Sequence, residues 1–365
     1  MVAISISEKE DNDGILTFQI DNAHVSMVNA LRRVILSEIS TVVIRGFPHE
    51  ENDIDCIKNT TRFNNEVLKH RLINIPIHIA DENIDISKYI LVIKKKNDTD
   101  SIMNITTQDF VIKHQNGSYL SNEAVQQIFP PNNITKEYIL FTRLRPAIGT
   151  QPGEEIHIEA TFTRSNAMED SAYNCVSTCS YIFTPDKVKQ KQAWDTKRKS
   201  LDSNLEDDEL LRMENDFYAI DAKRIYKSNS FQFTIESIGV YENDVILKKA
   251  CYVLQQKCND YKEKVETKEI EIKDGDCVNR AFDIILENDN YTFGKILEYA
   301  LYELYFKNEK SLSFISYKKT HPHDDYAFIR VMFKDDNMDA NNIYGMLKEG
   351  IRYNEILLES VLQQI

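Results

Sequence analysis

The chain has 365 residues, 42% of them hydrophobic and 28% charged, a composition typical of a globular protein with roughly two or three domains. Its formal net charge of −14 argues against a protein that mainly grips nucleic-acid phosphates, which would need a basic face. No run reaches the roughly 18–20 apolar residues of a membrane span, and the N-terminus lacks the basic and apolar regions of a signal peptide.

The cysteines are too sparse for a disulfide framework. They are Cys56, Cys175, Cys179, Cys251, Cys258 and Cys277. This usage favours a reducing, intracellular compartment. The pairs at 175 and 179 and at 251 and 258 lack the close spacing and nearby histidine of structural zinc sites. We therefore expect no metal and no cofactor, and we expect Cys251 and Cys258 to be buried thiols.

A strand, a turn and a helix are predicted within residues 14–44. Apolar and polar residues alternate over 15–20, which predicts a half-buried strand, and Asp21 and Asn22 favour a turn. Ser26 is the expected N-cap of a helix over Met27–Ile39. Its two apolar stripes consist of Val28, Leu31, Ile35 and Ile39 and of Met27, Ala30 and Val34. A helix that is apolar on two sides needs two packing partners.

Two adjacent arginines, Arg32 and Arg33, lie in the middle of this helix. They either form a solvated helix edge or pair with carboxylates or carbonyls of another subunit, for which the planar guanidinium is well suited. Because the helix has little free surface, the sequence predicts a docking helix.

The segment over residues 49–163 has the pattern of an insertion in this first unit. Three strands are predicted in it, over residues 89–93, 139–142 and 156–163. One predicted helical face near its start carries Phe63, Val67, His70 and Arg71. Pro76 then favours extended backbone for its neighbour.

After the insertion the pattern returns to that of the first unit. The predicted elements are a strand over 179–184, exposed helix and loop of mixed charge over 187–229, a strand over 231–240, a helix over Val245–Tyr261 and a charged junction over 262–268. The apolar side of the helix carries Val245, Leu247, Ala250, Cys251, Leu254, Cys258 and Tyr261.

The strand–turn–helix segment occurs a second time 266 residues later without a gap, so that Leu16 matches Phe282 and Ile35 matches Leu301. In this second copy a strand is predicted over Ala281–Leu286 and a helix from Phe293 to about Phe306. Strands over 311–317 and 326–333 and a C-terminal helix from about Met338 follow. Two distant copies are typical of two related, fused domains, which we expect to pack as a pseudo-symmetric pair.

Motifs for catalysis are lacking in the sequence. It has no Gly-x-Ser-x-Gly, no His-Glu-x-x-His and no glycine-rich phosphate loop. The one metal-like cluster consists of His321, His323, Asp324 and Asp325. Its His-Pro-His pattern is more often a turn than a set of ligands. A non-enzymatic module, without catalytic residues of its own, is the favoured interpretation.

Residues 29–39, Asn-Ala-Leu-Arg-Arg-Val-Ile-Leu-Ser-Glu-Ile, resemble the signature of the RNA polymerase alpha-type subunits, which include bacterial alpha, archaeal D and the third subunit of eukaryotic polymerase II. Asn59-Thr60-Thr61, Glu66 and the run His70–Ile77 resemble the next motif of this family. Ile73 and Asn74 stand where the family has Gly and Leu.

The second copy resembles the archaeal L subunit and the eukaryotic eleventh subunit. The similarity lies in residues 289–296 and in Tyr317 with His321-Pro322. Asn290, Tyr291 and Lys295 depart from the family pattern. Both subunits in one chain resemble the fused subunit of large DNA virus polymerases. This implies viral transcription in a virion and a cytoplasmic virus factory, or a nuclear protein if the chain is cellular.

The resemblance implies a non-catalytic assembly platform of a DNA-directed RNA polymerase. The implied partners are the second-largest subunit, the largest subunit indirectly, and small zinc-bearing subunits, with no membrane and no strong direct DNA binding. Third-subunit relatives often carry a cysteine zinc or iron–sulfur site in the insertion, but Cys56 is the only cysteine in residues 49–163. The insertion therefore cannot build such a site.

The predicted fold is α+β, with two related alpha-type dimerisation domains that form an intramolecular pseudo-dimer and an inserted mainly-β domain in the first. The predicted boundaries are 1–48 with 164–261 for the first dimerisation domain, 49–163 for the inserted domain, 262–268 for the junction and 269–365 for the second dimerisation domain.

Two sets of site residues are predicted. Those expected to contact the large subunit are Asn29, Arg32, Arg33, Glu66, His70 and Arg71. Those expected at the pseudo-dimer interface are Val28, Leu31, Ile35, Phe293, Ile296, Leu297, Leu301, Leu347, Ile351 and Leu358. The alternative function is a nucleic-acid-binding transcription regulator, which would require tight binding with a steep salt dependence.

Overall fold

The computed structural model describes residues 4–201, 206–275, 280–335 and 339–365. The chain divides into two compact units. Unit 1 contains Met1–Ile35, Thr178–Glu236 and Leu247–Ile365, and unit 2 contains Leu36–Ser177 and Ser237–Ile246. Within the described ranges, no helix has both the length and the apolar character needed to span a bilayer.

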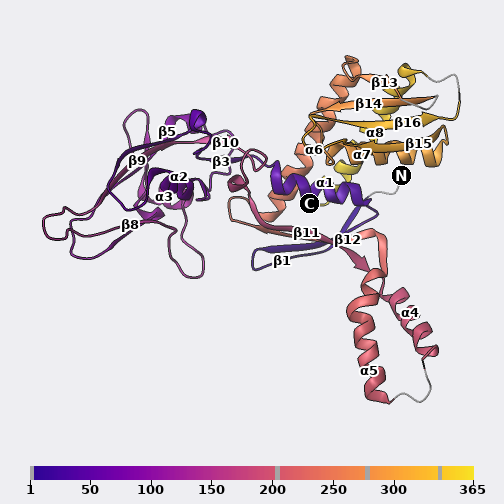
Figure 1. Ribbon diagram of the computed structural model, residues 1–365, viewed down its shortest axis with the longest axis horizontal. Coiled ribbons are helices and arrows are strands. Elements are labelled where there is room, and N and C mark those ends of the chain that lie inside the picture. Colours follow the sequence, from indigo (N-terminus) through magenta and orange to yellow (C-terminus); the bar gives the residue numbers. More distant parts are fainter. Residues whose placement is uncertain (1–3, 202–205, 276–279, 336–338) are drawn as a thin grey trace. The chain divides into compact units, whose positions relative to one another are not determined.

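Unit 1 is built on two four-stranded sheets with the same strand order (Figure 1). The first, β1-β2-β12-β11, contains β1 (Ser5–Asn12), β2 (Ile15–Asp21), β12 (Tyr226–Ser237) and most of β11 (Val176–Pro185). The second, β13-β14-β16-β15, contains β13 (Ile272–Asp274), β14 (Ala281–Glu287), β16 (Tyr326–Phe333) and β15 (Leu312–Lys318).

The helices of unit 1 follow the same strands in both halves. A first helix comes after the second strand, namely α1 (Val25–Ser37) or α7 (Phe293–Leu301). A long helix comes after the last strand in chain order, namely α6 (Asn243–Glu266) or α8 (Ala340–Leu362). The two halves of unit 1 therefore share one topology.

The internal repeat is visible at single residues. The bounds of β2, moved by 266 residues, become those of β14. Asn22 and Asn288, which the same shift makes equivalent, both have left-handed backbones, with φ of 60° and 52°. Asparagine adopts this conformation more readily than most residues because its short amide can bond the local backbone. The predicted strand and the predicted asparagine turn are thus present in both copies.

Several details of the sequence prediction are wrong. Ser26 is not an N-cap, because α1 already begins at Val25, and the Ser26 amide donates to His24 Nδ1 at 3.2 Å. Val245 is 36% exposed, whereas the other residues predicted on the apolar side of α6 are buried. The helix predicted to reach about Phe306 does so, but only its part up to Leu301 is α-helix (α7), and Tyr302–Asn308 continue it as a π-helix.

Gly294 lies in the first turn of α7 against the ring of Tyr317, and a Cβ at residue 294 would overlap that ring. We expect Gly294→Ala to lower the free energy of unfolding by about 1–3 kcal/mol, because the buried ring must move. In α8, a Cβ at Gly345 would meet no atom within 4 Å. Gly345→Ala should therefore raise the free energy of unfolding by roughly 0.5–1 kcal/mol. Thermal-denaturation midpoints check both expectations, and equal midpoints for the two variants would contradict them.

Unit 2 is mainly β. Its main sheet, β4-β9-β5-β7, is antiparallel throughout and contains β4 (Ile54–Asn59), β9 (Glu155–Thr161), β5 (Tyr89–Lys96) and β7 (Val111–His114). Two smaller pairs are formed by β6 (Met103–Thr106) with β8 (Leu140–Leu144) and by β10 (Thr163–Ser165) with β3 (Thr41–Val43). The helices α2 (Asn65–Ile73) and α3 (Asn122–Ile128) contribute Leu68, Leu72 and Val125 to the buried cluster of unit 2.

Between β11 and β12 the chain forms a helical hairpin (Figure 1). It consists of α4 (Lys187–Lys199), α5 (Asp207–Asp216), a π-helical continuation (Phe217–Asp221) and a 3₁₀ turn (Ala222–Arg224). The exposed helices predicted here are confirmed in the described residues. A small core in the hairpin, where the rings of Trp194 and Phe217 lie 5.5 Å apart, was not predicted from the sequence.

Gln364, just after α8, is hydrogen-bonded to the beginning of unit 1. Its Oε1 accepts from the Ile6 amide at 2.8 Å, and its Nε2 donates to the Ile4 carbonyl at 2.7 Å. The side chain of Gln364 therefore extends the hydrogen bonding at the start of β1.

Candidate functional site

The candidate site in unit 1 lies where α1 and α7 begin. Arg33 Nε donates to Thr292 Oγ1 at 2.8 Å, and Thr292 is 1% exposed. The His24 ring stacks on the Tyr299 ring, with centroids 3.6 Å apart and planes within 3°. These contacts connect residues that are more than 250 positions apart in the sequence, so no local pattern could predict them.

A hollow of about 800 Å³ lies beside these contacts. Its lining residues are His24, Val25, Ser26, Asn29, Arg33, Tyr181, Tyr291, Lys295, Glu298, Tyr299 and Tyr302. The four tyrosines offer apolar ring faces, whereas Arg33 and Lys295 supply positive charge, and Lys295 is paired with Glu298. Such a surface suits a partner side chain with an apolar body and an anionic end.

The two predicted arginines of α1 have different surroundings. Arg32 donates through Nε and Nη2 to Asn29 Oδ1, at 3.1 and 3.0 Å. Asn29 therefore orients the guanidinium of Arg32, which remains half-buried. Arg33 is held instead toward α7 through Thr292. The structure brings Asn29, Arg32 and Arg33 together on α1.

The other predicted contact residues lie on α2 in unit 2. Glu66 and His70 are exposed, and the His70 ring lies 6.4 Å from the Phe47 ring. Arg71 differs, since its Nε donates to the Phe141 carbonyl at 2.6 Å and its Nη2 to the Leu140 carbonyl at 2.9 Å. Two donors of Arg71 are thus used to hold α2 against β8.

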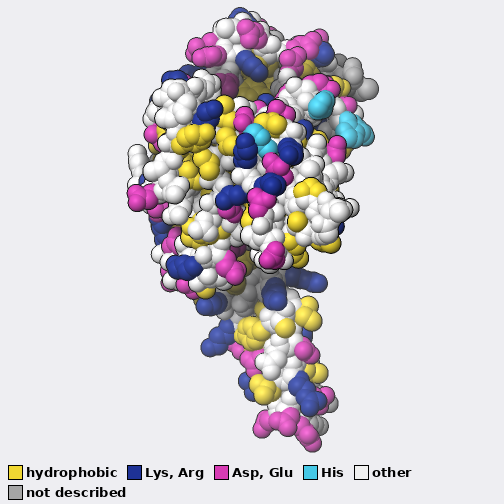
Figure 2. All heavy atoms as spheres, turned by 90° about the vertical axis from the view of Figure 1, so that its left-hand side faces the viewer, with side chains coloured by type: hydrophobic (Ala, Val, Ile, Leu, Met, Phe, Trp, Pro, Cys, Tyr) yellow, Lys and Arg dark blue, Asp and Glu magenta, His cyan; other side chains and the backbone are white. Residues whose placement is uncertain are grey.

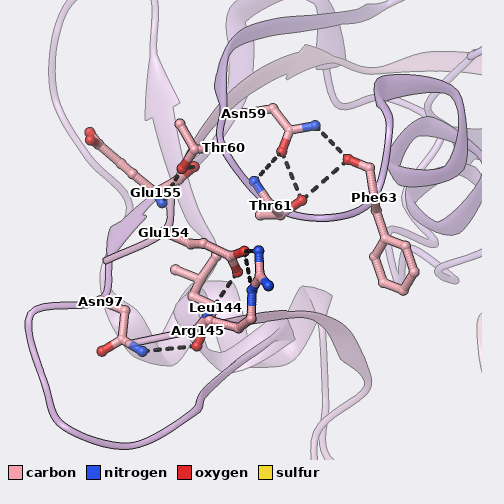
Figure 3. A network of polar contacts seen from close by, with 9 residues as sticks. All are labelled: Asn59, Thr60, Thr61, Phe63, Asn97, Leu144, Arg145, Glu154 and Glu155. Carbon is pink, nitrogen blue, oxygen red and sulfur yellow. Dashed lines mark hydrogen bonds and ion pairs between the residues drawn. The ribbon is translucent and has the colours of Figure 1, made fainter. Parts of the chain in front are cut away.

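The loop before α2 is fixed by its own side chains (Figure 3). Asn59 Oδ1 accepts from the amide and the hydroxyl of Thr61, and Asn59 Nδ2 donates to the Phe63 carbonyl at 2.8 Å. Thr60 Oγ1 donates to the Glu155 carbonyl and accepts from the Glu155 amide. The Asn-Thr-Thr sequence therefore anchors the start of α2 to β9.

A second group of bonds in Figure 3 lies at the same end of the main sheet of unit 2, where β5 ends and β9 begins. Arg145 donates to the carboxylate of Glu154, which is 6% exposed. Asn97, which is fully buried, donates to the Leu144 carbonyl at 2.8 Å. These residues stabilise the loops after β5 and β8, and their role was not predicted from the sequence.

The residues predicted at a pseudo-dimer interface are all buried. They are Val28, Leu31, Ile35, Phe293, Ile296, Leu297, Leu301, Leu347, Ile351 and Leu358. The Phe293 ring stacks on Tyr261 of α6, with centroids 4.3 Å apart. Asn354 of α8 donates to the Ile296 carbonyl at 3.3 Å. This buried asparagine was missed, because an isolated polar residue on an apolar helix gives no signal of its partner.

Cys251 and Cys258, predicted as buried thiols, are buried, whereas Cys56 is half-buried. Cys175, Cys179, Cys251 and Cys258 are at most 7% exposed, and Cys277 lies outside the described residues. Burial raises the pKa of the thiols of Cys251 and Cys258 to about 12, so both are protonated near neutral pH. The His321 cluster forms a turn in which the His321 amide donates to Asp324 Oδ2 at 2.8 Å.

Two half-buried histidines are expected to make the free energy of unfolding depend on pH. Burial lowers the pKa of His24 and His78 below the usual value of 6.5, because the charged imidazolium is poorly solvated. At acidic pH the unfolded chain therefore binds more protons than the folded chain. We expect full stability above about pH 6.5 and a progressive loss as the pH falls through the lowered pKa values. Urea midpoints measured between pH 5 and pH 7.5 check this.

The double variant His24→Gln plus His78→Gln serves as the control for this pH dependence. It should show a flatter dependence of the urea midpoint over the same range, because two of the groups that take up protons on unfolding are gone. An unchanged slope would contradict the assignment to these two residues.

Comparison with known proteins gives one family. Residues 17–258 match the family described as the RNA polymerase Rpb3/Rpb11 dimerisation domain. The chain is 23% identical over 281 residues to the DNA-directed RNA polymerase subunit Rpo3 of Methanosphaera stadtmanae, covering 70% of this chain and 96% of that protein. It is 23% identical over 300 residues to the DNA-directed RNA polymerases I and III subunit RPAC1 of Homo sapiens, covering 70% of this chain and 82% of that protein.

A third relative is the DNA-directed RNA polymerases IV and V subunit 3B of Arabidopsis thaliana, 21% identical over 303 residues and covering 69% of this chain and 88% of that protein. The family match contains most of β2, α1, the whole of unit 2, β11, β12 and most of α6. The chain belongs to the RNA polymerase Rpb3/Rpb11 dimerisation domain family.

Proposed function

We propose that this chain is a non-catalytic assembly-platform subunit of a multisubunit DNA-dependent RNA polymerase, on which the large catalytic subunits associate for transcription. The observation that carries the proposal is the family match over residues 17–258. It is supported by relatives that are named as polymerase subunits and that are covered over 82% to 96% of their length.

We further propose that α1 and α7 are the paired helices of an intramolecular pseudo-dimer. Arg33 contacts Thr292, the equivalent of Ser26 in the second copy. Tyr299, the equivalent of Arg33, stacks on His24 near the start of α1. Each helix thus uses the same position to contact the start of the other, a reciprocity typical of isologous interfaces. The common strand order of the two sheets gives independent support.

In this proposal, residues 1–48 with 164–261 form the first dimerisation domain, 49–163 the inserted domain and 269–365 a second, eleventh-subunit-like domain joined through 262–268. Joining two subunits by a short junction replaces a bimolecular association with an intramolecular one. The effective concentration of the second domain is then roughly millimolar. Assembly of the pseudo-dimer would not depend on the cellular concentration of a separate chain.

The proposed contacts to the second-largest subunit are Asn29, Arg32 and Arg33 on α1, with Glu66 and His70 on α2. Arg71 was predicted as a contact of the same kind, and its bonds to β8 support a positioning role for α2. The largest subunit would be held indirectly, and small zinc-bearing subunits would complete the assembly. We propose a viral fused subunit that acts in a virion and a cytoplasmic virus factory, or in the nucleus if the chain is cellular.

Co-purification tests the polymerase assignment. The full-length chain, tagged and expressed in the cells in which it normally occurs, is expected to copurify with two large polymerase subunits in amounts close to one per chain. Isolation of the tagged chain without either large subunit, from cells in which both are detected, would rule out the assembly role.

The same preparation separates this proposal from the nucleic-acid-binding alternative. On the face drawn in Figure 2, Lys and Arg side chains are interspersed with Asp and Glu. Mixed charge of this kind does not form the continuous basic surface that holds phosphates at physiological salt. The isolated chain is therefore expected to release duplex DNA at about 0.15 M salt, whereas tight retention would favour the alternative.

A further inference from the structure

The α4–α5 hairpin separates its charges between its two helices. In α4 there are six lysine or arginine residues and one aspartate, in a chain whose net charge is −14. In α5 there are five acidic residues and one arginine. The acidic first turn of α5 is explained by the helix dipole, which favours negative charge at a helix N-terminus. The positive charge of α4 needs a different explanation.

Part of the positive charge of α4 serves the hairpin itself. Lys189 pairs with Asp186 at 3.2 Å, and Lys197 pairs with Asp221 at 3.0 Å. Lys199 lies in the last turn, where a cation is favourable to the helix dipole. These residues therefore have structural roles.

Three other cations of α4 lie along one edge of the helix. Lys187, Lys191 and Arg198 are four and eleven residues apart, so at 3.6 residues per turn they fall within about 40° of one another over roughly 16 Å. All three are exposed, and none has an ion pair within the described residues. We call them the α4 basic edge. The dipole does not account for Lys187 and Lys191, which lie in the half of the helix where a cation is unfavourable.

An exposed apolar side chain accompanies the α4 basic edge. Val188 is 69% exposed, although the hairpin has its own core around Trp194 and Phe217. A phosphate backbone gains nothing from contact with a valine, whereas an amphipathic helix can cover the valine and place carboxylates opposite the cations. The strong net negative charge of the whole chain also repels a nucleic acid more than a short acidic segment.

We propose that the α4 basic edge, together with Val188, docks an acidic amphipathic helix of a protein partner. Cations at intervals of four and seven residues on α4 face carboxylates at the same intervals on the bound helix. The interface is small and largely solvated, so its affinity is modest and sensitive to salt. This surface is separate from the residues of α1 and α2 proposed to contact the large subunit.

The test uses the full-length chain and a designed helical peptide of about 20 residues with glutamates on one edge and leucines on the adjacent face. Fluorescence anisotropy is expected to show binding at low salt that weakens as salt is added. In the variant Lys187→Glu, Lys191→Glu, Arg198→Glu, the affinity should fall about tenfold or more, since three weak attractions are replaced by repulsions. Val188→Asp should weaken binding as well.

A matched control reverses three exposed cations elsewhere, Lys94→Glu, Lys136→Glu and Lys262→Glu, and so changes the net charge equally. This variant is expected to bind the peptide within about twofold of the original chain. Far-ultraviolet circular dichroism verifies that both triple variants remain folded. If both triple variants bound the peptide equally weakly, the loss of affinity would follow from the changed net charge alone, and the proposal would be overturned.

Two further outcomes also overturn it. One is the absence of peptide binding at low salt by the unaltered chain. The other is that a duplex DNA of similar length binds more tightly than the acidic peptide and that the α4 triple variant loses this DNA binding. That result would assign the surface to nucleic acid. A peptide with lysine in place of glutamate is expected not to bind.

Discussion

Replacing Arg32 and Arg33 together by glutamate is expected to abolish association with the large polymerase subunits while the chain remains folded. Both side chains are only half-buried, so their reversal leaves the cores of both units intact. Removing one partner of a buried, hydrogen-bonded charge pair at an interface costs about 2–5 kcal/mol, and reversal adds repulsion. The expected loss of affinity therefore exceeds about 100-fold. Co-purification of the variant with the large subunits measures it.

A matched control separates docking from the internal role of Arg33. Thr292→Val removes the hydroxyl that accepts from Arg33 Nε but keeps the arginine. It should lower stability by about 1 kcal/mol and leave assembly intact. If Thr292→Val prevented assembly as strongly as the double reversal, the arginine would act by holding α7, and its proposed contact with the large subunit would be wrong.

The second large effect is expected in the core beneath α7. Phe293 is fully buried, and its ring stacks on Tyr261 of α6 with an angle of 13° between the planes. Phe293→Ala should lower the free energy of unfolding by about 3–5 kcal/mol, because it leaves a cavity and removes the ring contact. If α6 and α7 share one core, the loss will extend to both helices.

Hydrogen exchange of individual segments measures where this loss occurs. Amides of residues 293–301 and 247–262 are expected to exchange faster in Phe293→Ala, whereas those of β5 in unit 2 remain protected. Phe314→Ala is the control, since Phe314 lies on β15 with 44% of its surface exposed. It should cost less than about 1 kcal/mol. Faster exchange confined to 293–301 would contradict a core shared with α6.

The main elements of unit 1 could be predicted from sequence because their patterns are local. Alternation over residues 15–20 corresponds to β2, and the same pattern 266 residues later corresponds to β14. Helix starts were less accurate. Ser26 has the residue type of an N-cap, but the ring of His24 accepts the Ser26 amide instead. Histidine is rarely expected in that role, so the sequence alone favours the wrong residue.

The contacts of the candidate site could not be predicted, because they depend on which residues meet in space. The sequence identified Arg33 as unusual, but its partner Thr292 lies 259 positions away. For Arg71, conversely, the sequence predicted a contact with another subunit, but the structure shows contacts within the chain. The place of Arg71 in a family motif predicted a partner contact, whereas its guanidinium bonds two carbonyls of β8. A guanidinium fits carbonyls within the chain as well as it fits those of another subunit.

The hydrogen bonds of Gln364 to Ile4 and Ile6 hold the end of α8 beside the start of β1. Segments that lie side by side can be linked by a short peptide, and new ends can then be opened at an exposed loop such as that around Lys268. In such a circular permutant, β14 and α7 would leave the ribosome before β2 and α1. The permutant would retain the strand pairing of both sheets. The half that contains β14 and α7 would then be synthesised first, and the half that contains β2 and α1 would pack onto it.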